Sequence, residues 1–255
     1  MKKFLCLTLI ICFVFLVACN KRDEAVAEQL NSAIDANNSQ QTLKCDYMLE
    51  ISFGSGTVMY YANGNAAWDR ENKTVNTFFN QTYLGASVVM ENYFADGKMV
   101  SVENGSAITV ERDGAVLVTK FPYFNLVKPN ADSLVSTGSN IHGDYFSFEL
   151  ENTNELCENL IGGDIYALTT VIKKPQKDKT KYGNTSCVYT VSDNKVLSAR
   201  YEFTVKLFDT PNGSANYTPP ESEYTLDLKV VAKVSYTDFG EGVKIEKYSS
   251  PDEAK

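Results

Sequence analysis

The stretch "LKCDYMLEISF", residues 43–53, alternates apolar and polar side chains over its whole length. Its odd-numbered positions are all apolar or aromatic, and its even-numbered positions are polar or charged apart from Met48. Successive side chains of a β-strand point to opposite faces of the sheet, so this period of two predicts a strand with one buried face. Strands usually have about five or six residues, and a run of this length predicts a tall, strongly twisted antiparallel sheet.

Two later stretches repeat the same alternation. They are "LSARYEFTVKL", residues 197–207, and "YTLDLKVVAKVSY", residues 224–236. Tyr201 lies on the apolar face of the first stretch, and Leu228 lies on the apolar face of the second. The three stretches together predict a mainly β fold of the α+β class, built on a sheet with one apolar face.

Hairpin turn signals separate shorter segments in the middle of the chain. In chain order they are Asp96-Gly97, Asn104-Gly105, Asp113-Gly114 and the segment "SDNK" at residues 192–195. Such residues favour the positive φ angles that tight hairpins need. The middle of the chain is therefore predicted to be a meander of short strands, which residues 121–140 interrupt with Pro122 and Pro129.

Two segments show helical spacing. Residues 23–36 place Val26, Leu30 and Ile34 on one face, and the Asn- and Ser-rich sequence that follows favours a turn. Residues 152–161 show a shorter pattern of the same kind. The helix at residues 23–36 and the segments within residues 121–161 are the pieces expected to cover the apolar face of the sheet.

The N-terminus has the composition of a secretory signal. Lys2 and Lys3 precede the apolar run from Phe4 to Ala18, which is shorter than the about 20 apolar residues that a transmembrane helix needs. The run ends in "LVAC" at Cys19, which resembles the lipobox of bacterial lipoproteins. The resemblance implies that the Cys19 thiol receives a diacylglycerol and that the chain is cleaved before it. An ordinary signal peptide cut elsewhere, or an uncleaved short anchor, is the alternative.

These features divide the chain into three parts. Residues 1–18 form the predicted signal peptide, residues 19–22 the lipidated cysteine and a short tether, and residues 23–255 a single β-rich domain. The predicted location is a membrane surface outside the cytoplasm, at the cell surface or in the periplasm. A formal net charge of −8 argues against nucleic acid as a partner, and a hydrophobic content of 44% is typical of a folded domain.

Three of the six cysteines lie in the predicted domain. Cys157 and Cys187 are a candidate disulfide in an extracytoplasmic setting, which leaves Cys45 free. The sequence contains no C-x-x-C pattern, so neither a zinc ribbon nor a thioredoxin-like motif is predicted.

Catalytic patterns are weak throughout the sequence. The single histidine, His142, cannot form a multi-histidine metal site, and no nucleophile-elbow motif accompanies it. The segment "SDNK" satisfies both S-x-x-K and S-D-N of penicillin-recognising enzymes, but those motifs are separate in that family and K-T-G is absent here. We therefore expect no enzymatic activity, no cofactor and no metal.

The apolar faces of the long strands exceed what the predicted helices can cover. A gap between a curved sheet and a thin helical lid would be an apolar cavity suited to a lipid or another hydrophobic ligand. The candidate lining residues are Tyr47, Leu49, Ile51, Tyr201, Phe203, Leu226 and Leu228. The alternative is a filled core in an interaction or sensory module whose acidic surface meets another envelope protein.

The order of these features resembles the LolA, LolB and LppX group of lipoprotein carriers and envelope lipoproteins. The shared features are the lipobox, one N-terminal helix, a long alternating strand, hairpins with turns such as "YFADGK", and a final long strand before "DFGEGVKIEKY". The resemblance implies a half-barrel, which is a single antiparallel, strongly curved sheet whose concave face is covered by an N-terminal helix and short helices. It also implies noncatalytic binding or carriage of a hydrophobic ligand by a protein that its N-terminal lipid holds on a membrane.

Overall fold

The computed structural model describes residues 24–83, 85–111, 123–161, 180–208 and 225–240, with the single positions 243, 245 and 248. The predicted signal peptide, Cys19 and its tether lie outside the described residues. The same holds for the predicted turn at Asp113-Gly114 and for Tyr224.

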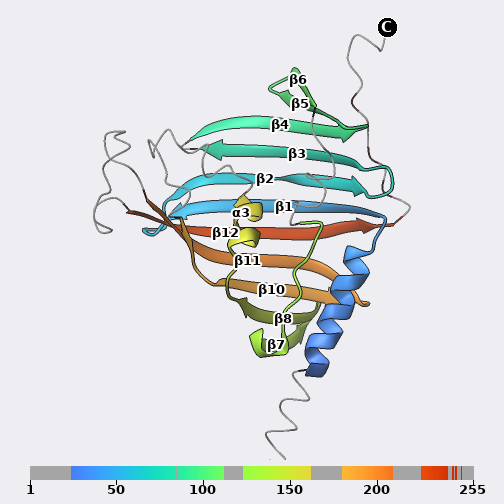
Figure 1. Cartoon of the computed structure of the whole chain (residues 1–255), viewed down its shortest axis with the longest axis vertical. Helices are drawn as coiled ribbons and strands as arrows, with labels where there is room; N and C mark the ends of the chain where they lie inside the picture. Colours follow the sequence, from blue (N-terminus) through green and yellow to red (C-terminus); the bar gives the residue numbers. More distant parts are fainter. Residues whose placement is uncertain are drawn as a thin grey trace, which may run out of the picture.

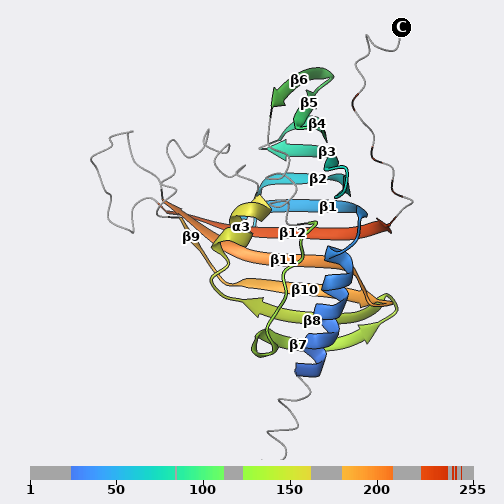
Figure 2. The same cartoon turned by 45° about the vertical axis from the view of Figure 1, so that its right-hand side comes forward.

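Twelve strands form one antiparallel sheet (Figure 1). In chain order the elements after the N-terminal helix are β1 (Thr42–Phe53), β2 (Val58–Asp69), β3 (Thr74–Tyr83), β4 (Ala86–Ala95), β5 (Lys98–Glu103), β6 (Ser106–Glu111), the 3-10 helix η1 (Ala131–Ser133), β7 (Leu134–Asn140), β8 (Gly143–Leu150), α3 (Asn154–Ile161), β9 (Lys181–Tyr182), β10 (Thr185–Ser192), β11 (Lys195–Phe208) and β12 (Thr225–Phe239). Their order across the sheet is β6-β5-β4-β3-β2-β1-β12-β11-β10-β8-β7, and β9 pairs with β11 beside this path. The sheet is curved but not closed, which confirms the predicted half-barrel fold class (Figure 2).

The three alternating stretches of the sequence lie side by side at the centre of the sheet. β1 pairs with β12 and β12 pairs with β11, so that Leu49 lies opposite Ala232, and Ala232 opposite Tyr201. All three side chains are buried in one core. Because a slip of one residue would turn every side chain to the other face, this register places the three apolar faces together on the concave side.

Tight turns join neighbouring strands where the sequence predicted them. Asp96-Gly97 joins β4 to β5 with φ angles of 54° and 78°, and Asn104-Gly105 joins β5 to β6 with φ angles of 47° and 84°. Asp193-Asn194, inside the "SDNK" segment, joins β10 to β11 with φ angles of 51° and 57°. Positive φ at both central residues gives these turns the twist that antiparallel strands require.

Two parts of the sheet differ from the prediction. β2, β3 and β4 have 12, 10 and 10 residues, although short strands were expected there. β7 lies inside residues 121–140, which were expected to interrupt the meander. In β3 the sequence "TVNTFFNQTY" has polar and aromatic residues on both faces, so it lacks the alternation that marks a half-buried strand.

The N-terminal helix, residues 24–38, crosses the concave side of the half of the sheet that contains β10, β8 and β7 (Figures 1 and 2). It buries Leu30, Ala33 and Ile34. The helix runs to Asn38, two residues past the predicted segment, and the buried carboxamide of Asn37 bonds to β11. Its Nδ2 donates to the carbonyl of Val196 at 2.8 Å, and its Oδ1 accepts from the N–H of Val196 at 2.9 Å.

The chain that leads into η1 runs over the middle of the concave face and ties the helix to the sheet. Asn38 bonds to both main-chain groups of Leu126, at 3.1 and 3.0 Å. The ring of Phe124 packs on Trp68 with centroids 4.8 Å apart. Arg70 lies 3.9 Å over the Trp68 ring and donates to the Phe124 carbonyl at 3.1 Å.

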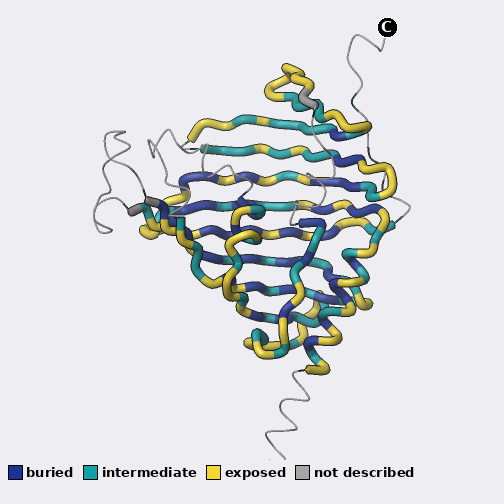
Figure 3. The backbone as a smooth tube through the Cα atoms, viewed as in Figure 1, coloured by how far each residue is buried: buried dark blue, intermediate teal, exposed yellow. Residues whose placement is uncertain are grey.

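The two halves of the concave face are covered unequally. α3, the short helix that the sequence predicted, lies over the centre of the sheet and buries Cys157, Leu160 and Ile161. Figure 3 shows that buried positions recur along the central strands β1, β12, β11 and β10, whereas β3 and β4 are mainly intermediate or exposed. The half under the N-terminal helix is therefore filled, and the half formed by β2 to β5 borders a hollow.

Candidate functional site

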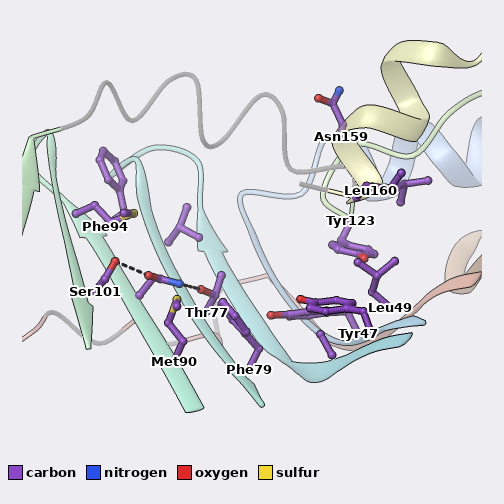
Figure 4. Close-up of a pocket in the computed structure, with 16 residues that line it drawn as sticks. Tyr47, Leu49, Thr77, Phe79, Met90, Phe94, Ser101, Tyr123, Asn159 and Leu160 are labelled. Carbon is purple, nitrogen blue, oxygen red and sulfur yellow. Dashed lines mark hydrogen bonds between the residues drawn. The ribbon is translucent and has the colours of Figure 1, made fainter. Parts of the chain in front are cut away.

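The hollow is a cavity of about 490 Å³ between the concave face of β1 to β5 and the edge of α3 (Figure 4). Specific small-molecule sites usually occupy about 300–1,000 Å³, so the volume is in the range of a ligand site. The lining residues are Tyr47, Leu49, Tyr60, Ala62, Val75, Thr77, Phe79, Met90, Asn92, Phe94, Met99, Ser101, Tyr123, Asn159, Leu160 and Ile161.

One end of the cavity is aromatic and aliphatic. The rings of Tyr47 and Tyr123 stack with centroids 5.2 Å apart. Leu160 and Ile161, at the end of α3, close this end from above, as Figure 4 shows for Leu160. Phe79 lies on β3, further along the same wall. Apolar surface of this kind favours ligands that remove it from water.

A row of polar side chains crosses the other end of the cavity. Thr77 on β3 lies opposite Asn92 on β4, and Asn92 lies opposite Ser101 on β5. Ser101 Oγ donates to Asn92 Oδ1 at 2.7 Å, and Asn92 Nδ2 donates to Thr77 Oγ1 at 3.0 Å (Figure 4). These two hydrogen bonds link the three side chains. The hydroxyl groups of Thr77 and Ser101 can also bond to a ligand, because a hydroxyl group can both donate and accept hydrogen bonds.

Among the described residues that line the cavity there is no Asp, Glu, Lys, Arg or His. Within the described ranges, no three His, Cys, Asp or Glu side chains meet in a cluster that could hold a metal ion. His142 lies exposed in the turn before β8.

The predicted lining residues fall into two groups in the structure. Tyr47 and Leu49 lie on the cavity wall. The other five are not among the residues of this wall: Ile51, Tyr201, Phe203 and Leu228 are buried in the core, and Leu226 is partly buried against it. These core positions lie where the N-terminal helix, the chain leading into η1 and α3 cover the sheet, and that covering is set by tertiary packing.

Most of the cavity wall comes from strands that sequence reasoning treated only as a short meander. β3 contributes Val75, Thr77 and Phe79, and β4 contributes Met90, Asn92 and Phe94. Each set has the two-residue spacing of one strand face, but the polar Thr77 and Asn92 interrupt the apolar pattern that would have marked that face in the sequence.

Cys45, Cys157 and Cys187 are all buried free thiols, so the structure differs from the predicted disulfide between Cys157 and Cys187. The Cys157 thiol instead lies 3.5 and 3.4 Å from the hydroxyl groups of Thr153 and Thr185. Burial raises the pKa of all three thiols, that of Cys45 to about 12. They are consequently poor nucleophiles in the folded protein.

No family model and no curated protein matches the sequence. Among solved structures, LprF from Mycobacterium bovis is similar over 87% of this chain and 95% of its own, with 10% identity and a TM-score of 0.45. A LolA superfamily protein from Nitrosomonas europaea covers 88% and 94%, with 7% identity and a TM-score of 0.27. A DUF1329 family protein from Desulfovibrio piger covers 88% and 95%, with 9% identity and a TM-score of 0.29. At these identities and TM-scores the similarity identifies neither a family nor a ligand.

The N-terminal helix and α3, which are the described α-helices, are both too short or too polar to cross a lipid bilayer.

Proposed function

We propose that this chain is a lipid-anchored, extracytoplasmic protein that binds a lipid or another hydrophobic ligand in the cavity between β1 to β5 and α3. The observation that carries the proposal is a cavity of about 490 Å³ whose described lining residues are mainly apolar and include no charged side chain. An acyl chain in this cavity would remove apolar surface from water on both sides, which contributes about 25 cal/mol per Å² buried.

The sequence at the N-terminus supports the same proposal. Cys19, the proposed lipid attachment site, is followed within five residues by the described start of the helix at Glu24. Five extended residues span at most about 18 Å. An anchor at Cys19 would thus hold the domain beside the bilayer, where hydrophobic ligands are concentrated.

Co-purification tests whether the cavity is occupied. A chain that begins at residue 20 would be purified from a bacterial envelope without detergent. The purified protein would be extracted with organic solvent, and the extract would be measured by mass spectrometry. We expect lipid in stoichiometric amount that survives dilution. An empty chain that also fails to take up an added fatty-acid probe would reject the cavity as a ligand site.

A matched pair of variants locates the bound molecule. Thr77→Trp fills the cavity, whereas Thr109→Trp adds the same ring at an exposed position of β6. With cis-parinaric acid as a fluorescent probe, we expect the Thr77 variant to bind at least about tenfold more weakly, which corresponds to about 1.4 kcal/mol. The Thr109 variant should bind like the unaltered chain. Equal binding by all three chains would place the probe elsewhere.

Cys19→Ser tests the anchor by itself. Serine has no thiol to receive the diacylglycerol, so the variant should leave the membrane fraction or remain unprocessed. A variant of mature size that still sediments with membranes would disprove lipidation at Cys19 and would leave the cavity proposal untouched.

A further inference from the structure

A second hollow lies on the convex face of the same strands, opposite the ligand cavity. It is an open groove of about 460 Å³ across β1 to β4. The groove residues are Asp46, Tyr47, Asn63, Gly64, Asn65, Phe78, Asn80 and Val89. Three of these eight are asparagines, which is an unusual share for the exposed face of strands because Asn is depleted there.

Strand pairing arranges the convex side chains of the groove in two rows. The first row is Asp46 on β1, Asn65 on β2 and Phe78 on β3, each directly opposite the next. The second row is Asn63, Asn80 and Val89 on β2, β3 and β4. Alternate residues along a strand are about 6.6 Å apart, so the rows form a grid with regular spacing in both directions.

The three carboxamides of this grid are free for a ligand. Asn63, Asn65 and Asn80 are exposed, and within the described part of the chain none of them bonds to another protein group. Each carboxamide offers two donor hydrogens and an acceptor oxygen. They therefore match a ligand whose groups both donate and accept hydrogen bonds at short, regular intervals.

An aromatic ring lies within the same groove. Phe78 is 40% exposed and Val89 is 39% exposed, although both are large apolar side chains on a sheet surface. Phe78 therefore presents an apolar ring beside polar carboxamides. A ligand that matches this surface carries an apolar face and hydrogen-bonding groups on one small ring. Of the groove residues that the structure describes, Asp46 alone is charged, and none is Lys or Arg.

We propose that this groove binds a neutral glycan of the cell envelope or surroundings. The vicinal hydroxyl groups of a sugar ring would bond to Asn63, Asn65 and Asn80, and the C–H face of the ring would lie on Phe78. The carboxylate of Asp46 accepts hydrogen bonds from hydroxyl groups and repels anionic polymers, which selects uncharged sugars. Apart from Tyr47, which borders both hollows, the groove residues differ from those of the ligand cavity, and the glycan proposal does not depend on the proposed lipid binding.

The test measures binding of dextran, laminarin and galactomannan, with alginate as an anionic comparison, to the full chain in mild detergent by biolayer interferometry. The groove variant is Phe78→Ala with Asn80→Ala. The matched control is Val135→Ala with Asn140→Ala, which removes one exposed apolar and one exposed Asn side chain on β7 at the opposite edge of the sheet.

We expect at least one neutral glycan to bind, the groove variant to lose about tenfold or more in affinity, and the control to stay within about twofold. Asn63→Ala alone, a single exposed change, gives the same readout if the double variant unfolds. The proposal would be overturned if none of the three neutral glycans bound, or if alginate bound equally well or more strongly. It would also be overturned if the folded groove variants kept the affinity of the unaltered chain.

Discussion

At the scale of single residues, Asn37 has a role that its residue type conceals. It is 1% exposed, and its carboxamide is paired with the N–H and C=O of Val196, which is itself fully buried. Asn is usually favoured at helix ends because it bonds to nearby main chain. Here the partner is 159 residues away, so the side chain fixes the helix on the sheet.

We predict that Asn37→Ala lowers the free energy of unfolding by about 2–4 kcal/mol, because it leaves a buried donor and a buried acceptor without partners. Urea unfolding followed by tryptophan fluorescence would measure the change at Trp68. Ser32→Ala, at an exposed position of the same helix, should shift the free energy by less than about 0.5 kcal/mol. Equal stability of the two variants would mean that the helix is held by its apolar face alone.

The buried thiols lead to a prediction about reactivity. Burial raises the pKa of Cys45 to about 12 and also raises the pKa values of Cys157 and Cys187. At pH 8 almost no thiolate is therefore present in the folded state, and only thiolate reacts with Ellman's reagent. A chain that begins at residue 20 should react slowly when folded and show three thiols in guanidinium. One thiol in denaturant would instead demonstrate one disulfide, for which Cys157 and Cys187 are the predicted pair.

At the scale of elements, Gly64 in the middle of β2 determines how closely the neighbouring strand can approach. A Cβ atom there would lie 1.8 Å from the carbonyl oxygen of Phe78 and 2.7 Å from the Cα of Phe79. Gly64 pairs with Tyr47 on one side and Phe79 on the other, and both of these line the ligand cavity. Glycine at such a site lets a strand bend where another backbone comes near.

Gly64→Ala should lower the free energy of unfolding by about 1–3 kcal/mol, the usual cost of overpacking, because the clash is with backbone rather than with a flexible side chain. It should also weaken probe binding, since relief of the clash moves Phe79. Gly54→Ala is the matched control, because its Cβ would meet nothing nearer than 3.7 Å. Chemical unfolding and cis-parinaric acid titration measure both effects; a fully stable Gly64 variant would exclude a close approach of β2 and β3.

The elements also show how far sequence reasoning reaches. β1, β11 and β12 were predicted because one face of each is apolar along its length, as at Leu49 and Tyr201. β3 was not predicted as a long strand because neither of its faces is apolar along its whole length. One face lines the cavity, and the other face is exposed to solvent. A strand whose two faces are both partly exposed has no strong contrast between them, so period two carries little signal there.

At the scale of the whole molecule, the sheet is one continuous structure with two different halves. The filled half is held by elements from distant parts of the chain, as in the contact of Asn38 with Leu126 and that of Tyr189 with the Val127 carbonyl at 3.3 Å. The position of the N-terminal helix and of the chain leading into η1 determines where the cavity lies. Sequence patterns predicted that a cavity could exist and named Tyr47 and Leu49 of β1, which lie on its wall. They also named residues of β11 and β12, which are not on this wall, because long-range covering leaves no local signal.

This asymmetry predicts unequal stability across the sheet. Regions with few buried contacts open locally at low free energy, so amide hydrogens of β4, β5 and β6 should exchange faster than those of β1, β11 and β12. Hydrogen exchange followed by mass spectrometry would resolve the two sets.

A ligand that binds only the folded cavity must raise the free energy of every opening that destroys the cavity. Addition of cis-parinaric acid should therefore slow exchange in β3, β4 and β5, whose side chains supply half of the wall, and leave the already protected β11 unchanged. The Thr77→Trp chain should show no such slowing, whereas the Thr109→Trp chain should behave like the unaltered protein. Uniform protection in the ligand-free protein would contradict a sheet with one filled half and one open half. Slowing of exchange that is confined to strands outside the cavity would contradict ligand binding in the open half.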